Sequence, residues 1–102
     1  MMVLNLEKDV AAAGTAERLV GDDLEVVSAV IQAKKSNTGA VYLGGAGVSD
    51  SSLGIELGPG ESFTLPQSAL SKDIRYFNLT DFWVDVAASG EGVSVLYFIR
   101  AV

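Results

Sequence analysis

Short apolar runs separated by glycine-containing turns recur along this chain and restrict the folds open to it. Residues 37–65 show the pattern most clearly, as NTGAVYLGGAGVSDSSLGIELGPGESFTL. Apolar runs of about four to eight residues bounded by turn signals are typical of β-strands, whereas helices need longer periodic segments. The pattern therefore predicts an all-β protein of roughly six to eight short strands, arranged as an antiparallel β-sandwich or jelly-roll-like barrel.

The strongest strand signals lie in residues 24–34 and 93–100. The first segment is apolar on both faces, which predicts a buried or central strand. In the second, Val93, Val95, Tyr97 and Ile99 alternate with the residues between them, as in a half-buried strand. Further extended segments are expected at residues 16–20, 40–43, 74–79 and 82–87 and on both sides of residues 58–61.

Turn chemistry places the reversals between these strands. Pro59 and Gly60 occupy the two central positions of residues 58–61, and Gly60 supplies the positive φ of a type II turn. Residues 36–39 form a second turn, since Asn and Gly are favoured there. Residues 44–52 are polar and glycine-rich, so we expect a surface loop. Residues 67–73 are polar and compatible with one helical turn.

The length of 102 residues predicts one globular domain. Residues 8–19 contain helix-favouring alanines, but Gly14 and Thr15 interrupt them and leave too few residues for a stable isolated helix. We therefore expect an extended N-terminal arm over residues 1–15 and a single β-sandwich domain over residues 16–102.

The formal net charge of −6 opposes binding to nucleic-acid phosphates and anionic membranes. The first residues lack the basic and long apolar regions of a secretory signal, and no run approaches the roughly 20 apolar residues of a membrane span. We expect synthesis in the cytoplasm, with neither nucleic acid nor membrane as partner.

The chain contains no histidine and no cysteine, which removes the side chains that most often carry acid–base and nucleophilic chemistry. Asp81 and Asp85 lie four residues apart, about 13 Å along a strand, too far for a carboxylate pair, and are expected to be solvated. Residues 45–47 lack the lysine of a phosphate-binding loop. Residues 50–56 do not match a calcium loop. We predict no enzyme activity, no metal and no cofactor.

Trp83 is the only tryptophan and leaves two interpretations open. Tryptophan is enriched in binding hot spots, so this side chain could stack on a sugar or anchor an interface. Equally, it could pack within the sheet.

Residues 37–65, followed by DFWVDVAASGEGVSVLYF, resemble small structural proteins of tailed bacteriophages that decorate or cement the head or form minor virion components. The similarity spans about residues 26–98 and rests on turn and strand signatures. It implies a capsid decoration protein that binds the major capsid protein on the outside of the head, with self-association as a homotrimer. Its alternative is a tail, neck or head-fibre module that recognises a host glycan or protein.

Contacts with these partners are expected in the arm, in the loop of residues 44–52 and at the tryptophan. The predicted interface residues are Val3, Leu4, Leu6, Val10, Val48, Ser49, Asp50 and Trp83.

Overall fold

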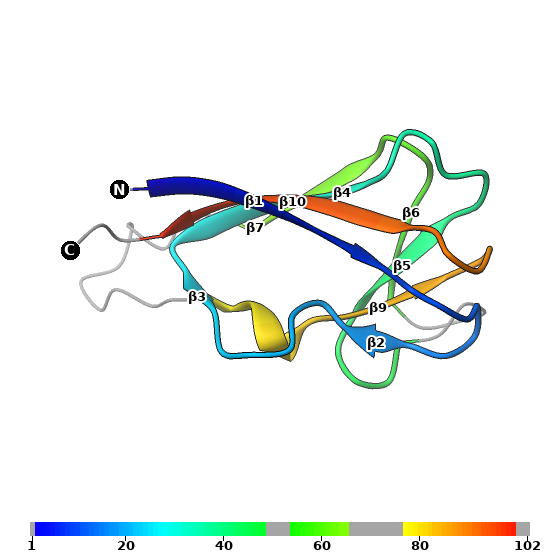
Figure 1. Cartoon of the computed structure of the whole chain (residues 1–102), viewed down its shortest axis with the longest axis horizontal. Helices are drawn as coiled ribbons and strands as arrows, with labels where there is room; N and C mark the ends of the chain where they lie inside the picture. The colour runs from blue at the N-terminus through cyan, green and yellow to red at the C-terminus, as the bar shows by residue number, and fades with distance from the viewer. Residues whose placement is uncertain (1, 49–53, 66–76, 100–102) are drawn as a thin grey trace.

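A computed structural model describes residues 2–48, 54–65 and 77–99 (Figure 1), and within them the regular structure is antiparallel β-sheet. The one helical element there is a short 3-10 turn, η2 (Leu79–Asp81). The prediction of an all-β protein is confirmed. The strands are β1 (Met2–Asp9), β2 (Glu17–Arg18), β3 (Glu25–Val26), β4 (Ser28–Ala33), β5 (Val41–Gly44), β6 (Ile55–Leu57), β7 (Ser62–Leu65), β8 (Phe77–Asn78), β9 (Trp83–Val86) and β10 (Gly92–Ile99).

The two halves of the chain pair as one nested ribbon. β5 pairs with β6, and moving outward β4 pairs with β7, β3 with β8, β2 with β9 and β1 with β10. Two further pairings, β10 with β4 and β9 with β5, join these pairs side by side. The result is a four-stranded sheet β1-β10-β4-β7, a second four-stranded sheet β2-β9-β5-β6, and the small β3-β8 pair (Figure 1).

Both four-stranded sheets contribute alternate residues to one apolar core. On β4 the buried residues are Ala29, Ile31 and Ala33, and on β10 they include Val93 and Val95. This confirms the predicted alternation along β10 and the central position of β4 in its sheet. The second sheet adds Val41, Leu43, Leu57, Val84 and Val86 to the same cluster.

The turn at residues 58–61 has the predicted type II features. Gly60 has φ 84°, and the Glu61 N–H donates to the Gly58 carbonyl oxygen at 2.9 Å. The Glu61 carboxylate in turn accepts from the Gly58 N–H at 2.6 Å. These bonds fix the short connection between β6 and β7.

Residues 2–9 differ from the extended arm that the sequence predicts. They form β1, which pairs along its whole length with β10, from Met2 opposite Ile99 to Asp9 opposite Gly92. Its alternation of Leu4 and Leu6 with Asn5 and Glu7 is that of a half-buried strand. Pairing with a partner strand some 90 positions later in the chain cannot be seen in the local pattern.

The sequence predicts one continuous strand over residues 24–34, whereas the structure has two strands there. β3 ends at Val26 and β4 begins at Ser28, while the Val27 N–H donates to the Phe98 carbonyl oxygen at 2.7 Å. This irregularity changes the alternation: Val26 is buried, and from Ser28 onward the odd-numbered residues face the core. The expected helical turn at residues 67–73 lies outside the described residues.

Candidate functional site

The outward face of the β1-β10-β4-β7 sheet carries mostly uncharged side chains, and its charged residues on the described strands, Glu7 and Asp9, lie together at the C-terminal end of β1. The strand registers place Val3 beside Phe98, and place Asn5, Leu96, Val30 and Thr64 in one row across all four strands. We call this surface the uncharged face. Its residues are Val3, Asn5, Ser28, Val30, Gln32, Ser62, Thr64, Ser94, Leu96 and Phe98.

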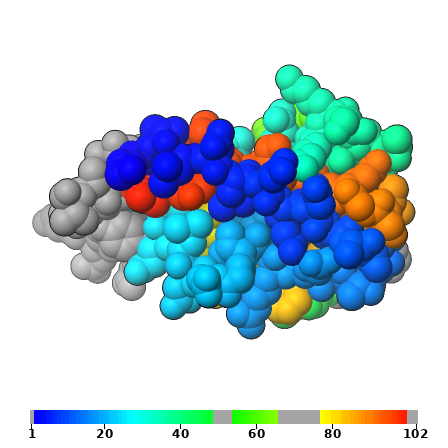
Figure 2. Space-filling model, in the orientation of Figure 1, coloured from blue at the N-terminus to red at the C-terminus, as the bar shows by residue number. Residues whose placement is uncertain are grey.

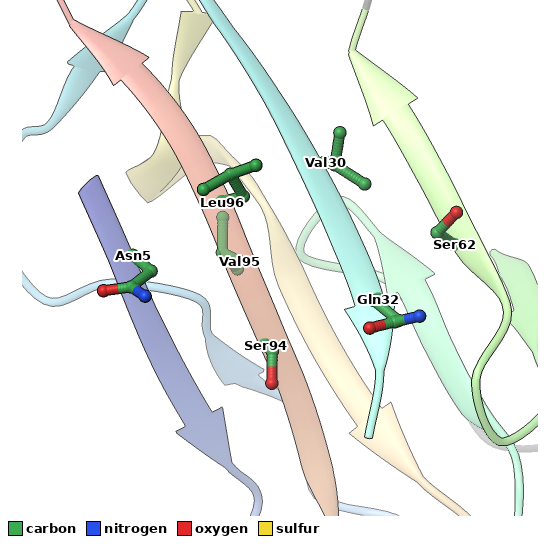
Figure 3. A pocket seen from close by; sticks show the side chains of 7 residues that line it. All are labelled: Asn5, Val30, Gln32, Ser62, Ser94, Val95 and Leu96. Atoms are coloured by element: carbon green, nitrogen blue, oxygen red, sulfur yellow. The ribbon is translucent and has the colours of Figure 1, made fainter. Parts of the chain in front are cut away.

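An open depression of about 320 Å³ lies within the uncharged face. Figure 3 shows its lining side chains, which come from all four strands of the sheet: Asn5, Val30, Gln32, Ser62, Ser94, Val95 and Leu96. The Gln32 amide donates to the Gly60 carbonyl oxygen at 3.0 Å, which fixes its orientation. Amide and hydroxyl groups beside two aliphatic side chains can bind another protein surface by hydrogen bonds and apolar contact.

Exposed apolar side chains are a second feature of the uncharged face. Val3 is 56% exposed and Leu96 43% exposed. Because Glu7 and Asp9 are confined to one end of β1, the remaining outward residues of the four strands form a continuous area without charge. Depletion of charge is the composition that distinguishes the centre of a protein–protein interface from the remaining surface. This surface is therefore the candidate functional site.

Charged groups border the uncharged face at the C-terminal end of β1, beside the start of β10. Lys34 Nζ lies 2.7 Å from Asp9 Oδ1 and 2.9 Å from Glu7 Oε2. The hydrogen bonds to Asp9 and then to Glu7 raise the pKa of Lys34. On the other side of β1, Lys8 Nζ lies 2.8 Å from Glu17 Oε1. Lys34 and Lys8 thus neutralise much of the charge at this border.

The structure separates the predicted interface residues. Val3 belongs to the uncharged face, whereas Leu4 and Leu6 lie on the opposite side of β1 and are half-buried. Val10 is fully buried in the core, and Val48 is 7% exposed. Ser49 and Asp50 lie outside the described residues.

Val48 is buried because the start of its loop folds back on the sheet. Its N–H donates to the Gly45 carbonyl oxygen at 3.0 Å. A Cβ on Gly44 would lie 3.4 Å from Val48, and one on Gly54 would overlap the Val48 side chain. Only Gly45, Ala46 and Gly47 are exposed in this part of the loop, so the expected surface position holds for them and not for Val48.

Trp83 lies on the second sheet, away from the uncharged face. It is half-buried on β9, opposite Arg18 of β2 and Gly44 of β5. The Arg18 guanidinium lies 5.4 Å from the centre of the indole ring, within the range of a cation–π interaction. The ring therefore packs against a strand neighbour while part of it stays exposed.

Asp85 was expected to be solvated, and that expectation is wrong. Its side chain is fully buried, and Oδ1 accepts from the N–H groups of Gly14 at 3.0 Å and Val86 at 2.8 Å. Within the described ranges, Oδ2 has no hydrogen-bond partner. The connection between β1 and β2 covers this carboxylate, a contact between residues about seventy positions apart.

Sequence reasoning missed most of the uncharged face, although its signal was present. Ser94, Leu96 and Phe98 are uncharged and alternate with the core residues of β10, and the next residue of that alternation in the sequence is Arg100. The matching rows on β1, β4 and β7 become visible only once the strand registers are known.

Two further features are absent from residues 2–48, 54–65 and 77–99. No group of three or more acidic side chains is placed there to hold a metal ion. None of the elements described is a helix long and apolar enough to cross a membrane. Among family models, curated proteins and solved structures, no match to this chain is found.

Proposed function

We propose that this chain is a non-catalytic binding protein that attaches through the uncharged face to a protein lattice, the outer surface of a tailed-bacteriophage head. The uncharged face carries the proposal, because a broad surface without charge suits contact with another protein. The resemblance of residues 26–98 to virion proteins supplies the identity of the lattice.

The strand pairing supports a finer description of the fold as a jelly-roll β-sandwich. A jelly roll is an antiparallel ribbon wound into two sheets, and the nested pairing from β5·β6 out to β1·β10 follows that plan. Viral capsid proteins and lectins both use this architecture, which is therefore compatible with lattice binding and with glycan binding.

The mechanism of a decoration protein is mass action. A protein that binds the assembled lattice, but not its separated subunits, stabilises assembly in proportion to its affinity and concentration. The net charge of −6 favours a position outside the shell, away from packaged nucleic acid. Neither step requires a catalytic residue.

The test is binding to purified mature heads, measured by co-sedimentation and located by electron microscopy. We expect density for this chain on the outer surface, with the β1-β10-β4-β7 sheet toward the capsid protein. Leu96→Lys introduces a charge into the uncharged face and should weaken binding at least about tenfold. Ile55→Lys, at a residue of β6 that is 42% exposed, is the matched control and should bind normally. A chain found only in tails or in infected-cell cytosol would contradict the proposal.

Recognition of a host glycan or protein is the second candidate, and the partly exposed Trp83 favours it. Indole rings stack on sugar rings, and the exposed glycines at 45 and 47 leave room beside the second sheet. A glycan array separates the two functions, since a decoration protein should give no signal. A signal that Trp83→Ala abolishes would establish the second function instead.

A further inference from the structure

β1 leaves one side of its sheet unpaired within the part of the chain that the structure describes. It is the outermost strand beside β10 and has eight residues, compared with four in β7 at the other edge. Figure 2 shows this N-terminal strand, in dark blue, uncovered on the near face of the molecule. A long open edge is a template for pairing with another strand.

Two hydrogen bonds show which backbone groups of β1 point to the open side. The Val10 N–H donates to the Glu91 carbonyl oxygen, in register with β1, and the Lys34 N–H donates to the Gly92 carbonyl oxygen on the other side of β10. Because hydrogen-bonded and non-hydrogen-bonded pairs alternate in antiparallel sheets, even-numbered residues of β1 bond to β10. The N–H and C=O groups of Val3 and Asn5 therefore point away from it.

The first five residues of β1 lack the features that normally prevent edge pairing. Residues 2–6, with the sequence MVLNL, contain neither charge nor proline. Met2 is 49% exposed and Val3 56% exposed. The charged residues follow at positions 7–9 and are held in ion pairs with Lys34 and Glu17. Native edge strands are usually protected by charge, proline or a bulge.

We propose that β1 is a homodimer interface, in which two copies of this chain pair antiparallel through residues 2–6 about a two-fold axis at Leu4. In this register Val3 lies opposite Asn5 of the other copy, so the backbone groups on the open side meet each other. Met2 lies opposite Leu6 on the core side, where the two copies together form an apolar strip.

Charge excludes registers in which β1 is shifted toward its C-terminus, and the uncharged segment 2–6 can pair with the same segment of a second copy. Each copy carries a net charge of −6, so a contact between copies is least opposed at a surface from which acidic residues are absent. With the two-fold axis at Leu4, each paired residue is uncharged, and the acidic residues 7 and 9 fall beyond the paired segment. A shift by two residues toward the C-terminus would place Glu7 opposite Val3 and Lys8 opposite Met2. The pairing also joins the uncharged faces of two copies into one surface.

A contact of this kind uses the same strand in both copies and closes at two. The proposal thus departs from the homotrimer that the resemblance implies, and it does not depend on which lattice or ligand the uncharged face binds. Light scattering coupled to size exclusion at tens of micromolar should give twice the chain mass. Either one or three times the chain mass would overturn the proposal.

Asn5→Pro tests the edge directly. Proline removes an N–H that points away from β10, so the pairing within the chain is kept while two bonds between copies are lost. We expect dimer association to weaken about tenfold or more. Thr64→Pro is the matched control. The Ala33 N–H bonds to the Glu61 carbonyl oxygen, so residues 61, 63 and 65 bond to β4 and the N–H of Thr64 points away from it. It should leave the dimer unchanged, and a dimer that also survives Asn5→Pro would refute edge pairing.

Cross-linking gives an independent result if the proline variant does not fold. The chain has no cysteine, and at the two-fold axis the Cα atoms of a non-hydrogen-bonded pair lie about 4.5 Å apart, within reach of a disulfide. Leu4→Cys should therefore give a covalent dimer on mild oxidation, seen on a non-reducing gel. Leu96→Cys, also near β1 but on the uncharged face, should remain monomeric on that gel. Equal cross-linking of the two variants, or none in either, would contradict the proposed register.

Discussion

The side chain of Asn37 pairs with the backbone of Gly92. Its Nδ2 donates to the Gly92 carbonyl oxygen at 2.8 Å, and the Gly92 N–H approaches Oδ1 at 3.4 Å. Asn37 is only 8% exposed, although turns usually lie at the surface. The turn at residues 36–39 is thereby attached to the start of β10, which explains why an amide is needed at this position.

Replacing Asn37 tests this attachment. Asn37→Ala should lower the free energy of unfolding by about 1–2 kcal/mol, because the carbonyl of Gly92 keeps its bond from the Lys34 N–H. Asn37→Asp should cost more, since it places a carboxylate oxygen where the amide donated to that carbonyl. Urea denaturation measures both. Equal stability of the two variants would show that the donor is unimportant.

Gly92 should tolerate no side chain. A Cβ there would overlap the Lys8 carbonyl oxygen and lie 2.7 Å from Asp9 Cα, so β1 would have to move away from β10. Gly92→Ala should therefore cost at least about 3 kcal/mol in thermal or urea unfolding.

Gly21→Ala is the control for that substitution. No atom lies within 4 Å of a Cβ at Gly21, and its φ is outside the left-handed region. Its stability should stay within about 0.5 kcal/mol of the natural chain or rise slightly. If both alanine variants behaved alike, close approach of β1 to Gly92 would not be the cause.

Glu91 makes stability dependent on acid. Its carboxylate accepts from the Gly39 N–H at 3.0 Å and from the Thr38 N–H at 2.7 Å, and these bonds hold the pKa of Glu91 below its ordinary value of 4.5. Because the pKa is lower in the folded chain, the stabilisation is complete above pH 4.5 and is lost as the pH falls toward the folded pKa.

Glu91→Gln should accordingly lower stability at neutral pH and make the loss of stability below pH 4.5 less steep. Denaturant midpoints measured from pH 7 to pH 3 give both quantities. Glu56→Gln, at an exposed position on β6, should keep the natural slope. An unchanged slope in Glu91→Gln would assign the acid dependence to other carboxylates.

The pair of Arg18 and Trp83 has an optical readout, because Trp83 is the only tryptophan. Arg18→Ala should remove the cation–π contact at 5.4 Å, shift the emission of Trp83 toward longer wavelength and cost about 0.5–1 kcal/mol. Lys35→Ala removes the same charge from an exposed position elsewhere and should leave the emission unchanged. A spectrum that is identical in Arg18→Ala would mean that the guanidinium does not cover the ring.

Local chemistry was sufficient for parts of this fold. The positive φ of Gly60 follows from the turn sequence, and the alternation of Val93 and Val95 follows from strand periodicity. Each depends on residues only a few positions apart. The central position of β4 between β10 and β7 agrees with its strong strand pattern, but only one of its faces is covered, because Val30 and Gln32 line the open depression.

Contacts between distant segments were not predictable from such patterns. Asp85 is buried by the segment around Gly14, and Val48 by the approach of Gly54 across its loop. Val3 was expected in the interface, but Leu96 and Val30 join it in the uncharged face only through the registers of β1, β10 and β4. The candidate site is a property of strand pairing rather than of any one segment.

The nested pairing also sets the order in which a growing chain can acquire its structure. β10 fills the place between β1 and β4, yet among the described strands it comes last along the chain. Until it leaves the ribosome, the first strand has no neighbour in its sheet, and β4 has an open side. Completion of this sheet therefore waits until residues 92–99 have been synthesised, and a chain truncated before residue 92 would leave β1 without its neighbour and β4 open on one side.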